Sequence, residues 1–224
     1  MNCDICYSAK THELISSQGV WKCQDCRILF RDSIMDIDFY HKKDYWYPDS
    51  KGLFLQQKSR FFWFEDYIVK GDSIEFGAAN GHVTYLIRMK QPDKYKVVYS
   101  EIKDMLAVCY TELDIHKWIG KMEDFIPYFP FKNVFLVDVI EHLRDTRSVF
   151  KKLREILKVG GRVFISTNDG DAFDAHLQMF YHKEHNFIFT SSALIKLARE
   201  FEFNPVATFH APQDWMYLVF EKVK

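Results

Sequence analysis

Short apolar runs alternate with amphipathic stretches from residue 71 onward. Runs rich in apolar or β-branched residues predict strands at 73–76, 97–101, 116–119, 134–137 and 163–167. Helical periodicity follows at 83–89, 104–110, 146–157 and 191–201, and two paired closing strands are predicted at 208–210 and 215–221. Gly160 and Gly161 are expected to stop the helix that precedes them. Strands and helices that alternate with short connections predict a parallel α/β sheet.

The first 70 residues follow a different pattern. Residues 38–47 are densely aromatic and charged, and apolar and polar positions in 53–69 predict a helix that lies on a sheet. Aromatic side chains in a connecting segment either pack two modules together or cover a bound cofactor, and spacing alone favours packing. We therefore predict three parts, with boundaries at 1–35, 36–70 and 71–224.

Four of the five cysteines form two Cys-x-x-Cys pairs. Cys3 and Cys6 are separated by sixteen residues from Cys23 and Cys26, which suits two thiolate pairs around one tetrahedral zinc ion. Two disulfides are the alternative, but they need an oxidising compartment, and the N-terminus carries no apolar signal segment. We predict a small zinc ribbon in residues 1–35. Its zinc is structural, because four cysteine ligands leave no open coordination position.

Composition and charge narrow the class of protein. The chain has 224 residues, of which 48% are hydrophobic and 27% charged, so it can bury one α/β core with a small appendage. The formal net charge of -1 provides no basic field, so nucleic-acid and anionic-membrane binding are not favoured. No apolar run is long enough to span a bilayer. We predict a soluble cytoplasmic protein.

The turn after the strand at 73–76 contains two glycines that suit a nucleotide cofactor. Gly77 allows a tight reversal and Gly81 a close approach, although an ordinary strand-to-helix turn contains glycines too. Glu101 follows Gly81 by 20 residues and ends the next strand. In a parallel sheet this carboxylate lies beside the turn, where it can accept hydrogen bonds from both hydroxyls of a ribose.

Two further segments complete a resemblance to a known family. Residues 138–145 read Asp-Val-Ile-Glu-His-Leu-Arg-Asp, and residues 157–161 read Leu-Lys-Val-Gly-Gly. With the turn at 74–81 and Glu101, these segments resemble class I S-adenosylmethionine-dependent methyltransferases over residues 71 to about 220. Ala79 and Val159 depart from the usual glycine and proline. The N-terminal cysteines make the chain similar to the subgroup with a zinc module, which includes sugar C-methyltransferases.

The resemblance implies a fold and a cofactor. The fold is a Rossmann-like, doubly wound, seven-stranded α/β sheet, and the cofactor is S-adenosylmethionine. The implied cofactor-binding residues are Glu75, Gly77, Ala79 and Gly81 at the methionine part, Glu101 at the ribose, Met122 and Glu123 at the adenine, Asp138 at the sulfonium and amino groups, and Tyr40 and Tyr47 in a segment over the cofactor.

The segment after the strand at 163–167 carries the substrate face in the family. His185 with Phe189 and Thr190 resembles a recurrent His-x-x-x-Phe-Thr segment. A histidine at the cofactor can accept a proton from an acceptor, so His185 is the candidate catalytic base, with His142, His176 and His182 behind it. The alternative is a loop histidine that caps the next helix.

Together these observations predict methyl transfer to a small-molecule acceptor. A nucleotide-linked sugar or another metabolite is favoured, because the charges of the ribbon cancel. An RNA methyltransferase that docks RNA on the ribbon is the alternative, although nucleic acid is not the expected partner. A third interpretation is a non-catalytic binding protein that keeps the fold.

Overall fold

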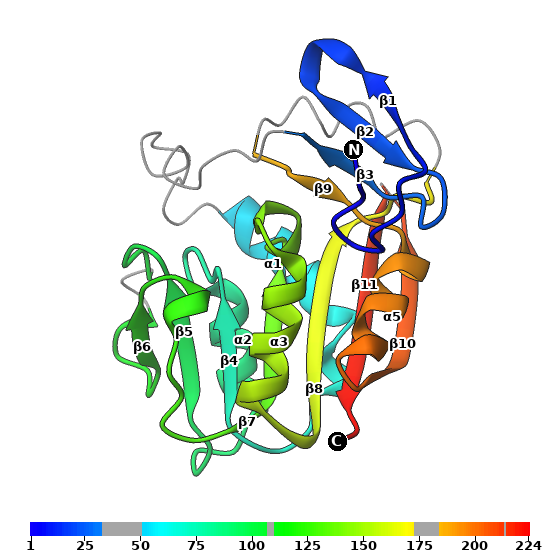
Figure 1. The fold of residues 1–224 in the computed structure, drawn as a ribbon. Helices are drawn as coiled ribbons and strands as arrows, with labels where there is room; N and C mark the ends of the chain where they lie inside the picture. The colour runs from blue at the N-terminus through cyan, green and yellow to red at the C-terminus, as the bar shows by residue number, and fades with distance from the viewer. Residues whose placement is uncertain (33–50, 107–109, 173–183, 213) are drawn as a thin grey trace.

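The computed structural model describes residues 1–32, 51–106, 110–172, 184–212 and 214–224. Within these residues the chain forms two sheets (Figure 1). The larger sheet has seven strands in the order β10-β11-β8-β7-β4-β5-β6, and the smaller has four in the order β1-β2-β3-β9. The smaller sheet consists of β1 (Thr11–Ile15), β2 (Val20–Cys23), β3 (Leu29–Arg31) and β9 (Phe187–Ile188).

The seven-stranded sheet is mostly parallel. Its strands are β4 (Ser73–Phe76), β5 (Val97–Glu101), β6 (His116–Ile119), β7 (Phe131–Val137), β8 (Leu157–Asn168), β10 (Phe203–Ala211) and β11 (Trp215–Lys222). Strands β4 to β8 pair in parallel, whereas β11 is antiparallel to both β8 and β10. The predicted α/β fold with a seven-stranded sheet is therefore confirmed.

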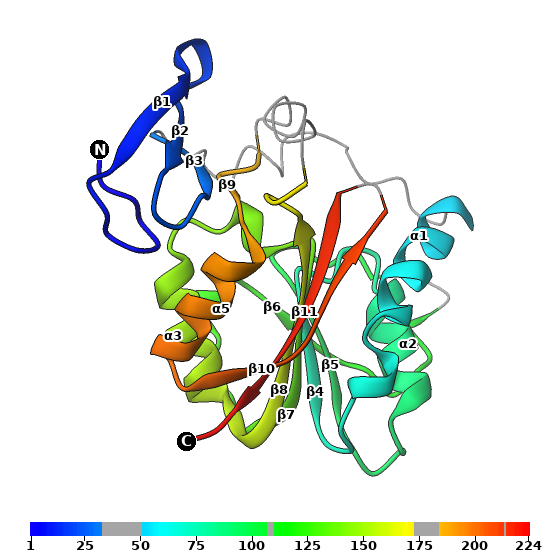
Figure 2. The ribbon, with the colours of Figure 1, turned by 90° about the vertical axis from the view of Figure 1, so that its right-hand side faces the viewer.

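Helices cover both faces of this sheet. Figure 2 shows α1 (Lys51–Phe62) and α2 (His82–Lys90) on one face, and α3 (Thr146–Ile156) and α5 (Ser191–Glu200) on the other. Short 3-10 turns occur at η1 (Ser16–Gln18), η3 (Glu65–Tyr67), η5 (Met122–Asp124) and η6 (Ile140–His142). Helices α3 and α5 begin at polar caps, because the side chains of Asp145 and Thr190 accept the hydrogen bonds of backbone N–H groups three residues later. Aromatic rings fill the core beside α1, where Phe135 stacks on Phe164 with ring centres 4.4 Å apart.

The helix predicted at 53–69 ends early. Helix α1 stops at Phe62, because the next two side chains turn into the core. Trp63 stacks on Tyr217 with ring centres 5.4 Å apart, and Phe64 is fully buried.

Two other predicted helix features are wrong. Residues 104–106 are not helical, because the N–H of Met105 donates to the Tyr99 hydroxyl and that of Leu106 to the Asp104 carboxylate. Gly160 and Gly161 belong to β8 rather than to a helix stop. The φ of +70° at Gly160 lets β8 pass an irregularity in its pairing with β7.

The small sheet is joined to the C-terminal third of the chain. Strand β9 adds to β3, and the pairing was not predicted because β9 has only two residues. The buried hydroxyl of Thr190 donates to the carbonyl of Cys26 at 2.9 Å, and the guanidinium of Arg31 donates to the carbonyl of His185 at 3.0 Å. Figure 1 shows this sheet beyond the end at which β8 finishes. The N-terminal segment therefore holds residues 185–190.

Among the described residues, every helix is too short or too polar to cross a lipid bilayer.

Candidate functional site

A pocket opens at the carboxyl ends of the central strands. Its wall is formed by the segments that follow β4, β5, β6 and β7, with two side chains from α1. The lining residues are Leu53, Gln57, Glu75–Asn80, His82, Val83, Ser100–Ile102, Met105, Gly120–Glu123, Val137–Val139 and His142–Arg144. Parallel α/β sheets bind ligands at the carboxyl ends of their strands, at the point where the strand order reverses. In this sheet that point lies between β4 and β7.

The turn after β4 has an unusual backbone. Gly77 and Ala79 have φ of +66° and +44°, in the left-handed region. A Cβ at Gly77 would lie 2.5 Å from Cγ2 of Val139, so the position needs glycine for space as well as conformation. Ala79 is held by the hydroxyl of Tyr99, which donates to its carbonyl at 2.7 Å. The alanine that replaces the usual glycine is thus accommodated.

Glu101 closes this turn from the neighbouring strand. One carboxylate oxygen accepts the N–H of Ala79 at 3.0 Å, and the other accepts the N–H of Ile102 at 2.7 Å. The prediction that Glu101 lies beside the glycine turn is therefore correct in position. An ionised carboxylate has about four acceptor sites, so both oxygens can still accept ligand hydroxyls.

Glu75 is a buried acid in the pocket wall. It is 3% exposed, and its carboxylate accepts a short hydrogen bond from the hydroxyl of Thr84. Burial raises the pKa of Glu75 to about 8, and the nearby Glu101 adds to the rise. A cationic group in the pocket would favour the ionised form of this acid.

Asp138 follows β7 and is held from two sides. Its φ is +57°, and its carboxylate accepts the hydroxyl of Ser166 at 2.8 Å. It also forms an ion pair with Arg60 of α1, whose guanidinium lies 4.1 Å from the centre of the Trp215 ring. Burial lowers the pKa of Arg60. The pair fixes the position of Asp138 in the pocket wall.

The remaining cofactor candidates differ in their position. Met122 and Glu123 line the pocket, and the first of them is buried. Gly81 does not line it, because this residue caps α2, where an added Cβ would lie 2.3 Å from Leu106. Tyr40 and Tyr47 lie outside the described residues.

Sequence reasoning did not assign Leu53 and Gln57 of α1 or Arg144 to the site. Arg144 lies in the segment 138–145, on which the family resemblance rests. The sequence motif could therefore have indicated that Arg144 belongs to the site. Nothing in the spacing of α1 indicated which of its side chains reach the pocket.

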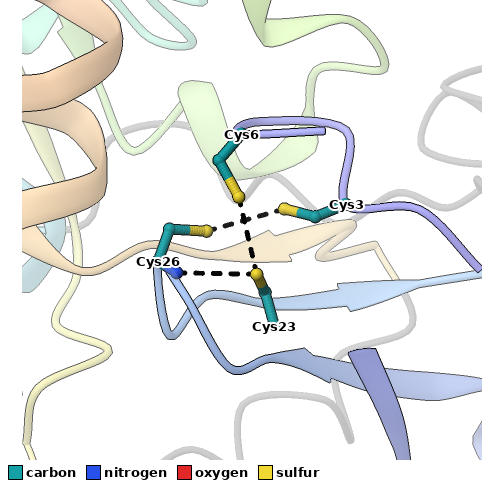
Figure 3. Close-up of side chains that lie close together, drawn as sticks. All are labelled: Cys3, Cys6, Cys23 and Cys26. Atoms are coloured by element: carbon teal, nitrogen blue, oxygen red, sulfur yellow. Dashed lines mark hydrogen bonds between the residues drawn. The ribbon is translucent and has the colours of Figure 1, made fainter. Parts of the chain in front are cut away.

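A second centre lies in the N-terminal sheet, where the four cysteines point toward a common point (Figure 3). We call Cys3, Cys6, Cys23 and Cys26 the cysteine centre. The sulfurs of Cys3 and Cys26 are 3.5 Å apart, as are those of Cys6 and Cys23. All four lie within 4.8 Å of one another, and none forms a disulfide. Tetrahedral Zn–S bonds of about 2.3 Å place sulfurs about 3.8 Å apart, so the geometry fits one metal ion.

His185, the candidate base, lies between this sheet and the pocket. Its ring is edge-on to that of His142, with centres 4.8 Å apart. His142 lines the pocket, whereas His185 does not. His176 and His182 lie outside the described residues. The predicted base is therefore next to the pocket wall rather than part of it.

Comparison with known proteins identifies the family. The sequence profile of a family described as methyltransferase domain matches residues 53–208, well over half of the chain. No curated protein matches the sequence significantly. The chain therefore belongs to the methyltransferase-domain family.

Solved structures share the fold at low sequence identity. A protein of Pyrococcus horikoshii OT3 is 16% identical with a TM-score of 0.67, covering 84% of this chain and 100% of its own. The N-methyltransferase NodS from Bradyrhizobium japonicum WM9 is 15% identical with a TM-score of 0.59, and the match covers 78% of this chain and 99% of NodS. The magnesium protoporphyrin IX methyltransferase of Synechocystis PCC 6803, solved with bound SAH, is 12% identical with a TM-score of 0.59, covering 76% and 84%.

Proposed function

We propose that the pocket binds S-adenosylmethionine and that the chain transfers its methyl group to a small-molecule acceptor. The observation that carries the proposal is the meeting of the glycine turn, Glu101 and Asp138 in one pocket. S-adenosylmethionine supplies an electrophilic methyl group on a sulfonium. The protein then has to hold the donor and align the acceptor with it.

Each side chain has a proposed part. Glu101 accepts hydrogen bonds from the ribose hydroxyls, and the backbone at Gly77 and Ala79 lies against the methionine part. Glu75 and Asp138 provide negative charge for the sulfonium and amino groups. Met122 and Glu123 flank the adenine. The role of His185 as a base stays a prediction.

We propose that the cysteine centre holds a structural zinc ion. Three of the four cysteines are buried and Cys6 is partly buried. The short distances between their sulfurs and the absence of a disulfide among the described cysteines also support the proposal. Four thiolates saturate a tetrahedral ion, so the centre stabilises the N-terminal sheet rather than performing chemistry. We also propose that the chain belongs to the methyltransferase subgroup with an N-terminal zinc module, which includes sugar C-methyltransferases.

A small-molecule acceptor is favoured by the formal net charge of -1, which gives the chain no basic field for a nucleic acid. The magnesium protoporphyrin IX methyltransferase is named for a small-molecule acceptor, which is consistent with this choice. We therefore propose a metabolite, such as a nucleotide-linked sugar, as the acceptor.

The acceptor class is tested with tritium-labelled S-adenosylmethionine. The zinc-loaded protein is incubated with a nucleotide-sugar mixture, a low-mass cell extract or total RNA, each with and without enzyme. We expect label in a low-mass product. Label that enters RNA, with none in the low-mass fractions, would contradict the small-molecule proposal and favour the RNA alternative. Tight cofactor binding without transfer to any pool would favour a non-catalytic protein.

A further inference from the structure

Glu141, His142 and His185 form a cluster beside the pocket. One possible ligand atom from each residue lies within 4.8 Å of the others. The first two belong to η6 after β7, and the third precedes β9. We call these three residues the Glu-His-His cluster.

Hydrogen bonds lock the two segments that carry the cluster. The backbone N–H of Asn186 donates to the carbonyl of Glu141 at 2.8 Å, and its side-chain amide donates to the carbonyl of His142 at 2.9 Å. Asn186 is 1% exposed. The neighbouring β9 is in turn paired with β3. The cluster is therefore held in place by backbone contacts that do not depend on its own side chains.

Glu141 is buried, and only one of its two carboxylate oxygens accepts a hydrogen bond from the described residues. The residue is 1% exposed, and one oxygen accepts the hydroxyl of Thr167 at 3.0 Å. Its other oxygen, Oε1, is buried and has no hydrogen-bond partner among the described residues. The positive charge of Arg60 is felt by Glu141, but the ion pair of Arg60 is formed with Asp138. A buried carboxylate oxygen without a partner costs free energy, which a bound cation would recover.

The orientation of His142 fits metal binding. Its Nδ1 lies 3.0 Å from the carbonyl of Glu184, to which it can donate. A carbonyl that accepts the Nδ1–H fixes the tautomer with its lone pair on Nε2, which is the form in which histidine ligates metal ions. Two imidazoles and a carboxylate form a nitrogen and oxygen ligand set that suits Zn²⁺, Mn²⁺ or Fe²⁺.

We propose that the Glu-His-His cluster binds a divalent transition-metal cation at the edge of the pocket. Three protein ligands leave coordination positions open, and His142 lines the pocket, so the ion can bind an oxygen atom of the acceptor. This role for the ion rests on the proposed methyl transfer, whereas its binding does not. This proposal gives His185 the role of a metal ligand in place of its predicted role as a general base.

Manganese binding tests the proposal separately from the cysteine centre. Untagged protein is stripped of metal, refolded with one equivalent of zinc and titrated with Mn²⁺ alone, while electron paramagnetic resonance counts the free ion. Soft thiolates favour zinc, and a nitrogen and oxygen site accepts manganese. We expect one bound Mn²⁺ per chain. A wild-type protein that leaves all the Mn²⁺ free would overturn the proposal.

Two variants locate the site. Glu141→Gln keeps an acceptor for Thr167, and His185→Gln keeps the backbone carbonyl that Arg31 uses, so at least one should fold and retain zinc. Each should weaken Mn²⁺ binding more than about tenfold. The exposed His116→Gln serves as the matched control and should bind as the wild type does. Folded variants of both cluster residues with unchanged Mn²⁺ affinity would contradict the proposal.

Calorimetry with S-adenosylmethionine on the same wild-type sample separates the two proposals. Cofactor binding without Mn²⁺ binding would overturn the metal site alone. Mn²⁺ binding without cofactor binding would support the metal site and contradict the proposed function.

Discussion

Glu75 carries a carboxyl group that the fold keeps away from water. Its pKa is raised from the ordinary value of 4.5 to about 8 by burial. Between these values the folded protein holds a proton that the unfolded chain has lost. The free energy of unfolding therefore falls as the pH rises through this interval.

The Glu75→Gln variant should remove this contribution, because glutamine has no proton to lose and can still accept from Thr84. Between pH 6 and 8, the wild type should lose roughly 2 kcal/mol of unfolding free energy relative to the variant. Urea unfolding of the zinc-loaded wild type and variant at each pH measures this difference in unfolding free energy. The exposed Glu112→Gln should follow the wild type. Equal pH dependence of wild type and Glu75→Gln would show that Glu75 does not titrate as described.

Single residues also show how far the sequence predicts the site. Glu101 was located from its spacing to Gly81, because strand ends in a parallel sheet meet at one edge. Asp138 was placed in the site from its motif. Its ion pair with Arg60 was not foreseen, since it depends on how α1 lies against β11.

At the scale of elements, the strands of the large sheet were predictable and some boundaries were not. Buried parallel strands such as β5 and β7 appear as continuous apolar runs, which periodicity detects. The early end of α1 depends on a distant partner, Tyr217. The loop at 104–106 depends on a hydrogen bond to the side chain of Tyr99 in the preceding strand, which periodicity does not detect. Pairing between β3 and β9 joins residues more than 150 positions apart, and a two-residue strand leaves almost no local pattern.

This pairing connects the cysteine centre to residues 187–190, so the centre is expected to stabilise their position. Removing the proposed zinc ion with a chelator should loosen β3 and, with it, β9, because Thr190 donates to the carbonyl of Cys26. We expect faster hydrogen exchange at residues 187–190, measured by mass spectrometry. Strand β7 in the same sample is the internal reference and should be unchanged.

Unchanged exchange at 187–190 after complete loss of zinc would contradict a positioning role for the cysteine centre. Faster exchange throughout β7 would show instead that the whole domain unfolds.

In the whole molecule, the small N-terminal sheet lies at one end of the large sheet. The pocket lies at the carboxyl ends of β4, β5, β6 and β7. The N-terminal sheet includes β9 and lies beyond the end of β8 (Figure 1). The Glu-His-His cluster lies where η6 meets the segment before β9. In the proposed function, the large sheet holds the methyl donor and the N-terminal sheet lies near the segment that would meet the acceptor.

The pocket is proposed to hold S-adenosylmethionine through the glycine turn and Glu101. Isothermal titration calorimetry of the zinc-loaded protein tests it most directly, with Glu101→Gln and Glu112→Gln as matched variants. We predict one cofactor molecule per chain for the wild type and for Glu112→Gln, with affinity weakened about tenfold or more in Glu101→Gln. No binding to folded wild-type protein at millimolar cofactor, or equal affinity in Glu101→Gln, would contradict the account.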